Sequence, residues 1–194
     1  MPRLLKWLIG TLAAASALML MLWGLVAGYI AYEYPYGASH CCDLALADAL
    51  ILYAERHDGW FPRGEATPEA SLSLLHREKL ASADLLRGKS VPLPTVEARL
   101  ICGELLTPDT CGWHYVEGLR RDDDPRLGLF WDKAGLSHNG GRLPGGGHTV
   151  IFVNRDRKQI RAENWRNFLA EQQGLLAERA SAKSESKTRG SNVE

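Results

Sequence analysis

The sequence lacks net charge, and it also lacks several motifs that mark common classes of enzyme. Its 194 residues contain 23 basic and 23 acidic side chains, so the charge balance does not favour binding to nucleic acid. There is no Gly-x-Ser-x-Gly and no His-Glu-x-x-His, the motifs of many serine hydrolases and zinc peptidases. The glycine-rich stretch 140–147 lacks the Gly-Lys-Ser/Thr ending of a phosphate-binding loop and is typical of a loop before a strand. We therefore expect a protein that is not an enzyme and does not bind nucleic acid.

Cysteine is scarce, and the spacing that is usual for zinc ligands, Cys-x2–4-Cys, is absent. The four cysteines are Cys41, Cys42, Cys102 and Cys111. Cys102 and Cys111 flank a Pro-Asp turn signal, so they are candidates for a disulfide that closes a short loop. Cys41 and Cys42 would then form a vicinal pair, stay as free thiols, or pair with the other two. A metal site is the alternative, because His40 precedes the vicinal pair and His114 follows Cys111.

No EF-hand spacing is present, although acidic side chains do cluster in one part of the chain. The run Asp122, Asp123 and Asp124, with Asp132 further on, offers oxygen ligands of the kind that calcium prefers. Runs of mixed charge such as 120–124 are more often solvated loops. Calcium is therefore the one cofactor that the sequence raises, and we expect no other.

Charge is entirely missing from the 26 residues between Trp7 and Tyr32. About 20 apolar residues in a helix suffice to cross the hydrocarbon layer of a membrane. Arg3 and Lys6 precede this segment and the acidic Glu33 follows it, so the positive-inside rule predicts residues 1–6 in the cytoplasm and residues 33–180 outside. The alternative is a cleaved signal peptide, but its apolar core would normally be only about 7–15 residues long. We expect an uncleaved, single-pass anchor at residues 7–32 of the inner (cytoplasmic) membrane, with the lipid bilayer as its first partner.

Two glycines lie four residues apart inside this predicted anchor. Gly24 and Gly28 form a small-xxx-small pattern, which lets two membrane helices approach closely. They are candidate contact residues for self-association within the membrane.

Helical periodicity is clearest just after the anchor. Leu44, Ala47, Leu50, Ile51 and Ala54 recur at helical spacing, which predicts a helix over 43–58. The sequence Thr67-Pro68-Glu69 combines a capping residue, a proline at the first helical position and an acid in the first turn, so it predicts a second helix up to about residue 80. The stretch 82–100 contains Gly88, Pro92 and Pro94, and we expect irregular structure there.

β-Branched and aromatic residues dominate the next part of the chain. They predict four strands, over 112–117, 127–132, 148–154 and 158–161. An amphipathic helix is predicted over 163–179. The segment 181–194 is rich in Ser, Lys and Glu, and it predicts a disordered tail. The fold class is α+β: a transmembrane helix, further helices, a small antiparallel sheet and a C-terminal helix.

Three short segments resemble those of bacterial type IV pilins and pseudopilins, and in particular planctomycete-style pilin-like proteins. The first is the N-terminal membrane helix followed by an extracytoplasmic helix. The second is Leu44–Ala54 followed by His57-Asp58-Gly59-Trp60-Phe61-Pro62, and the third comprises segments 129–133, 138–141 and 149–154. Residues 1–8 contain no Gly-Phe pair and the apolar span contains no Glu, so no prepilin peptidase motif is recognisable.

This resemblance implies a pilin-like extracytoplasmic domain and a structural or assembly role in the cell envelope, without enzymatic activity. The partners would be other envelope proteins or further copies of the chain. A competing class is an envelope protein that handles electrons or metal ions through His40, Cys41, Cys42, Cys102 and Cys111.

Overall fold

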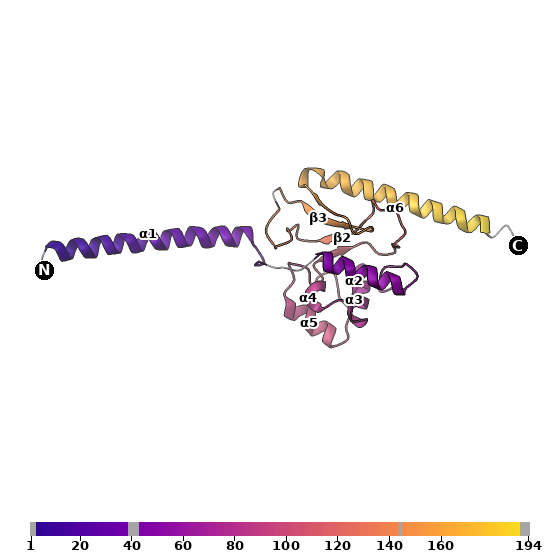
Figure 1. The fold of residues 1–194 in the computed structure, drawn as a ribbon, viewed down its shortest axis with the longest axis horizontal. Coiled ribbons are helices and arrows are strands. Elements are labelled where there is room, and N and C mark those ends of the chain that lie inside the picture. Colours follow the sequence, from indigo (N-terminus) through magenta and orange to yellow (C-terminus); the bar gives the residue numbers. More distant parts are fainter. Residues whose placement is uncertain (1–2, 39–42, 144, 191–194) are drawn as a thin grey trace.

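A long helix projects away from a mixed helix-and-sheet domain in the computed structural model of the chain (Figure 1). The structure describes residues 3–38, 43–143 and 145–190. The projecting helix is α1 (Arg3–Glu33). The elements that follow are α2 (Asp43–Arg56), α3 (Pro68–Arg77), α4 (Ala83–Leu86), α5 (Leu93–Ile101), β1 (Trp113–Tyr115), β2 (Gly128–Asp132), β3 (His148–Phe152), β4 (Arg157–Ile160) and α6 (Ala162–Gly190). The predicted combination of an apolar N-terminal helix, a small antiparallel sheet and a C-terminal helix is confirmed.

The sheet has four antiparallel strands in the order β1-β2-β3-β4, and helices cover both of its faces (Figure 1). Because side chains alternate along a strand, Ile151 of β3 packs into the larger core beside α2 whereas Val150 and Phe152 join a smaller cluster with Phe168 of α6. Leu129 of β2 interrupts the register with β3 as an extra residue, so both it and Phe130 lie in the larger core.

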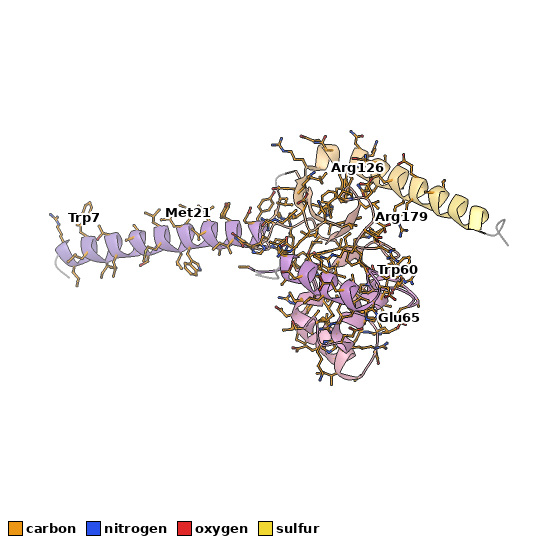
Figure 2. All side chains as sticks on the ribbon, turned by 45° about the vertical axis from the view of Figure 1, so that its right-hand side comes forward. Trp7, Met21, Trp60, Glu65, Arg126 and Arg179 are labelled. Carbon is orange, nitrogen blue, oxygen red and sulfur yellow. The ribbon has the colours of Figure 1, made fainter. Side chains whose placement is uncertain are left out.

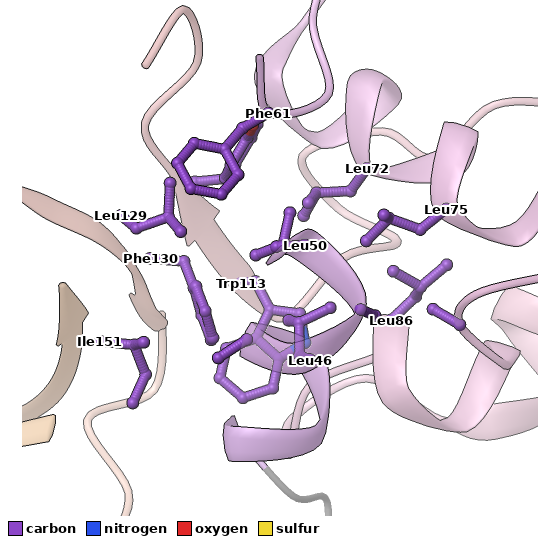
Figure 3. Close-up of a cluster of buried hydrophobic side chains, with 14 of the residues drawn as sticks. Leu46, Leu50, Phe61, Leu72, Leu75, Leu86, Trp113, Leu129, Phe130 and Ile151 are labelled. Carbon is purple, nitrogen blue, oxygen red and sulfur yellow. The ribbon is translucent and has the colours of Figure 1, made fainter. Parts of the chain in front are cut away.

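Leucines and aromatic rings from several elements fill the larger core (Figure 3). Leu46 and Leu50 of α2 are fully buried, as are Leu72 and Leu75 of α3. Trp113 of β1 lies among them, and its ring meets that of Phe130 edge-on, with centroids 5.3 Å apart. This packing explains the helical spacing of apolar residues in α2, since its buried apolar residues all belong to this core.

Helix starts agree with the expected capping signals. The side chain of Thr67 accepts a hydrogen bond from the Ala70 backbone N–H at 3.1 Å, and Pro68 is the first residue of α3.

The first helix of the domain ends at Arg56, two residues earlier than predicted, because Asp58 and Gly59 both adopt positive φ angles.

The prediction of irregular structure over 82–100 is wrong. The side chain of Ser82 caps α4, and Leu93 begins α5 just after Pro92. The prolines stand at or before the first turn of α5, where the missing N–H costs no hydrogen bond, so they mark a helix start and not a break. Val96 and Leu100, four residues apart, provide the buried side of this short helix.

The C-terminal helix also continues further than we expected. Helix α6 extends to Gly190, so the backbone of residues 181–190 is helical where the sequence predicted disorder. Extending an existing helix needs no new nucleation, and the packed first part of α6 supplies that nucleus.

Candidate functional site

The end of α1 meets the domain at a loop between β2 and β3, and a single arginine makes most of the contact. The Arg142 guanidinium donates a hydrogen bond from Nε to the Tyr32 carbonyl oxygen at 2.7 Å and lies 5.1 Å from the centre of the Tyr32 ring. The Arg142 backbone N–H donates to the Glu33 carbonyl at 2.8 Å. The last carbonyls of a helix lack partners within it and carry partial negative charge, so these two donors cap α1.

This loop is held in shape by its own backbone hydrogen bonds. Ser137 N–H donates to the Gly141 carbonyl at 2.7 Å, and Gly140 N–H donates back to the Ser137 carbonyl at 2.9 Å. Gly140 adopts a φ of +81°, and a Cβ on Gly141 would lie 3.1 Å from the Glu33 carboxylate. The glycines that the sequence assigned to a loop therefore allow a tight turn to approach the end of α1.

A cavity of about 600 Å³ lies between this loop and the end of α1. Tyr32, Glu33 and Tyr36 line it on the side of α1, and Arg142 lines it on the side of the loop. Gly145 and Gly146, both exposed and both with positive φ, contribute no side chain to its wall. The cavity thus combines one cation, one anion and two aromatic rings.

The same loop also reaches the first residue of α2. The Asp43 side chain is buried, and its Oδ1 accepts the Leu44 backbone N–H at 3.0 Å. Its Oδ1 lies 3.4 Å from His138 Nδ1 and 3.7 Å from Arg157 Nη1, while Oδ2 has no hydrogen-bond partner among the described residues. Loop residues 136–142 therefore contact both the end of the apolar helix and the start of the first domain helix.

A second group of charged residues surrounds the end of β2, and the sequence analysis did not predict it. Lys133 Nζ donates to Glu69 Oε1 at 2.6 Å and to the Pro108 carbonyl at 2.8 Å. Burial alone would raise the pKa of Glu69, but the hydrogen bond and charge of Lys133 outweigh it and lower that pKa. The neighbouring Asp132 carboxylate accepts the backbone N–H groups of Lys89 and Ala134, yet burial raises its pKa. Each of these groups has a partner inside the protein, which is typical of a structural network.

Two histidines next to this network lie against tryptophan rings. The His114 ring lies 4.2 Å from that of Trp131, and desolvation lowers the His114 pKa. The His148 ring lies 4.1 Å from that of Trp165, and its Nδ1 is 2.8 Å from the Asp132 carbonyl. These rings extend the smaller aromatic cluster beneath α6, so packing explains their positions.

The predicted disulfide between Cys102 and Cys111 is not formed. Cys102 is exposed at the end of α5, whereas Cys111 is buried, and its thiol donates to the Leu86 carbonyl at 3.4 Å. Burial raises the pKa of Cys111 to about 12, so this thiol is unreactive. The other candidate residues, His40, Cys41 and Cys42, lie outside the described residues.

The acidic residues proposed for calcium do not converge on one point. Asp122 accepts from Arg120 Nε at 2.9 Å, and Asp124 accepts from Arg126 Nη2 at 2.6 Å. Asp123 lies 2.7 Å from Arg179, and Asp132 belongs to the buried network described above. Within the ranges that the structure describes, no group of three or more His, Cys, Asp or Glu side chains is arranged to hold a metal ion.

Helix α1 is exposed along nearly its whole length. Every residue from Leu5 to Tyr32 is exposed, and Figure 2 shows Trp7 and Met21 projecting away from the helix. Among the described residues, α1 alone is long and apolar enough to cross a membrane. Gly24 and Gly28 lie in open space on it, with nothing within 4 Å of a Cβ at either position. The chain matches no family model, and no curated protein or solved structure is significantly similar to it.

Proposed function

We propose that this protein is a single-pass, non-enzymatic structural or assembly component of the cell envelope, with a pseudopilin-like layout. Helix α1 would anchor it in the inner membrane with its N-terminus in the cytoplasm, and the domain that begins after Glu33 would stand outside. The observation that carries the proposal is the exposure of the uncharged segment 7–32 of α1, a helix that Arg142 joins to a well-packed domain. An exposed apolar surface of this length requires a non-aqueous environment.

The contact between anchor and domain supports a positioning role. Arg142 makes hydrogen bonds to two successive carbonyls at the end of α1, and His138 of the same loop lies beside Asp43 at the start of α2. The loop that caps α1 is therefore itself held against the domain, and this arrangement would orient the domain relative to the membrane. Such attachment suits a component that must meet partner proteins or further copies of the chain in a fixed orientation.

The exposed thiol of Cys102 provides a direct test of topology. Spheroplasts that express a Cys41→Ser, Cys42→Ser variant would be treated with a membrane-impermeant maleimide. Their membranes would then be washed with carbonate. We expect Cys102 to be labelled without lysis and the labelled protein to stay in the carbonate-washed membrane. Any label reports on Cys102, because Cys111 is buried and unreactive. A matched variant that also carries Cys102→Ser should not be labelled. Labelling that requires lysis would place the domain in the cytoplasm and overturn the proposal.

Self-association through the anchor can be tested in detergent. Replacing Gly24 and Gly28 with Ile should convert any dimer of the full chain to monomer in sedimentation, because the larger side chains keep two helices apart. Ala15→Ile is a suitable control, since residue 15 lies on the opposite face of the helix from Gly24. A dimer that survives the double Gly replacement would exclude these glycines as the contact.

A further inference from the structure

We propose that the cavity at the end of α1 binds the headgroup of a zwitterionic aminophospholipid, a phosphoethanolamine carried on a lipid. The inference rests on the proposed membrane anchorage of α1. Four observations lead to it. They are the position of the cavity at the end of α1, the terminal nitrogens of Arg142, the carboxylate of Glu33, and the space left by the absence of side chains at two glycines.

The cavity lies at the level where lipid headgroups meet the end of a membrane helix. Exposed tyrosines at positions 29, 32 and 36 surround this end of α1, and Glu33 is the first charged residue after the apolar span. Tyrosine rings are enriched at membrane–water interfaces, where one edge is apolar and the other is hydrated. Tyr32 and Tyr36 line the cavity itself, so the cavity opens beside the headgroup layer.

Arg142 supplies the group that would bind phosphate. Its Nε donates to Tyr32, whereas its two terminal nitrogens make no hydrogen bond to any described residue, and the side chain is exposed. The planar guanidinium fork suits bidentate contact with a phosphate group. Because the Nε bond to the end of α1 fixes the guanidinium in place, it is oriented before a ligand arrives.

Glu33 decides which headgroup fits. It lines the same cavity as Arg142, and none of the other described residues that line the cavity carries a charge. A purely anionic headgroup would satisfy the arginine but would face an unpaired carboxylate. A phosphoethanolamine group brings a phosphate for Arg142 and an ammonium for Glu33, and the ring of Tyr32 or Tyr36 offers the ammonium an aromatic face. The absence of side chains at Gly145 and Gly146 leaves room for the group within the 600 Å³.

Native mass spectrometry of the full chain in detergent provides the test. After removal of lipid, the protein would be titrated with phosphatidylethanolamine or with phosphatidylglycerol of the same acyl chains. We expect at least about tenfold tighter binding of phosphatidylethanolamine, since only this lipid carries an ammonium for Glu33. Glycerophosphoethanolamine without acyl chains should bind at least about tenfold more weakly than the lipid. Equal binding of the two lipids, or of the soluble headgroup and the lipid, would overturn the proposal.

Two variants separate the contributions of the charged residues. Glu33→Gln should remove the preference for phosphatidylethanolamine while phosphate binding persists, and Arg142→Gln should weaken the binding of both lipids. Glu163→Gln and Arg126→Gln are the matched controls, because neither residue lines the cavity, and both should leave the tenfold preference unchanged. An unchanged preference in Glu33→Gln would contradict the inference even if Arg142→Gln proved too unstable to study.

Carbonate extraction of the membranes from which the protein is purified distinguishes failure of the inference from failure of the proposed function. Protein that stays in the membrane but shows no lipid preference would overturn the headgroup site alone. Protein that carbonate releases from the membrane would overturn the anchorage on which both proposals rest.

Discussion

The two longest helices of the protein have similar lengths and very different surroundings. Helix α1 has 31 residues, and those from Leu5 to Tyr32 are all exposed. Helix α6 has 29 residues and buries Phe168, Gln172 and Leu175 against the sheet and its connections. Gln172 also joins α6 to the start of β2 by hydrogen bonds, because its side-chain amide accepts from Gly128 N–H and donates to the Arg126 carbonyl. Two helices of similar length can therefore have different surroundings, and the chemistry of their exposed side chains distinguishes them.

The difference between the two helices can be tested most directly by placing charge in the middle of α1. Replacing Leu18 and Leu22 with Arg should cost about 5–7 kcal/mol of insertion free energy, at roughly 2.5–3.5 kcal/mol for each charge near the centre of the bilayer. We expect the variant to be lost from carbonate-washed membranes, while the Leu18→Ala, Leu22→Ala variant should remain there. Retention of the double Arg variant would mean that α1 does not cross the hydrocarbon layer.

Removal of one ring should detach α6 from the sheet. Phe168 packs edge-on against Trp131 and Phe152, with ring centroids 6.1 and 6.2 Å away. Phe168→Ala should lower the free energy of unfolding by about 3–5 kcal/mol, measured by denaturant titration of the full chain in detergent. Faster amide exchange should be confined to α6 and the strands beneath it. Arg166→Ala, at an exposed position of the same helix, should change stability by less than about 0.5 kcal/mol.

A pair of Gly→Ala variants should have effects of opposite sign in the packed domain and in α6. A Cβ on Gly112 would overlap the Arg87 carbonyl and lie 3.0 Å from the Gly88 Cα, so Gly112→Ala should destabilise by about 2–3 kcal/mol. Gly174 has nothing within 4 Å of a Cβ and lies inside α6, so Gly174→Ala should stabilise by about 0.5–1 kcal/mol. Thermal unfolding of the two variants measures both. A destabilised Gly174→Ala would show that this part of α6 is packed more closely than the structure indicates.

A modest effect is expected from breaking the ion pair between Lys133 and Glu69. Lys133→Met should lower the free energy of unfolding by about 1–2 kcal/mol at pH 7, because it leaves a mostly buried carboxylate without its partner. Since Lys133 lowers the folded-state pKa of Glu69, that stabilisation is present above the ordinary glutamate pKa and is lost as pH falls through the lowered value. The difference between variant and wild type should therefore shrink below about pH 4.5.

Arg161→Met is the control for this measurement. Arg161 pairs with Glu163 at 3.6 Å, but both side chains are highly exposed, so the pair contributes little. An Arg161→Met variant as unstable as Lys133→Met would contradict the distinction between the buried and the exposed pair.

Local signals in the sequence predicted much of the domain. The periodicity of α2, the Thr67 cap of α3 and the β-branched residues of β3 each identified an element to within a few residues. The prediction failed over 82–100, because Pro92 and Pro94 stand at the start of α5 and do not interrupt regular structure. The disulfide prediction failed for a different reason, because spacing along the chain does not reveal that Cys111 faces the core and Cys102 the solvent.

Local sequence signals could not predict the candidate site at the end of α1. Arg142 lies 110 positions from Tyr32 along the chain, and no local pattern links them. The same holds for Asp43 and His138, and for Glu69 and Lys133. In each case the partner is selected by how the loops after β2 are placed relative to the helices.

The sequence by itself determined the properties that depend on near neighbours. The absence of charge between Trp7 and Tyr32 makes α1 long and apolar enough to cross a membrane, and capping residues set where α3 and α4 begin. Only the tertiary structure decided which residues meet across long separations. It placed Arg142 against the end of α1 and created the cavity beside it, because those contacts arise from the packing of the whole domain and not from any interaction within a single turn.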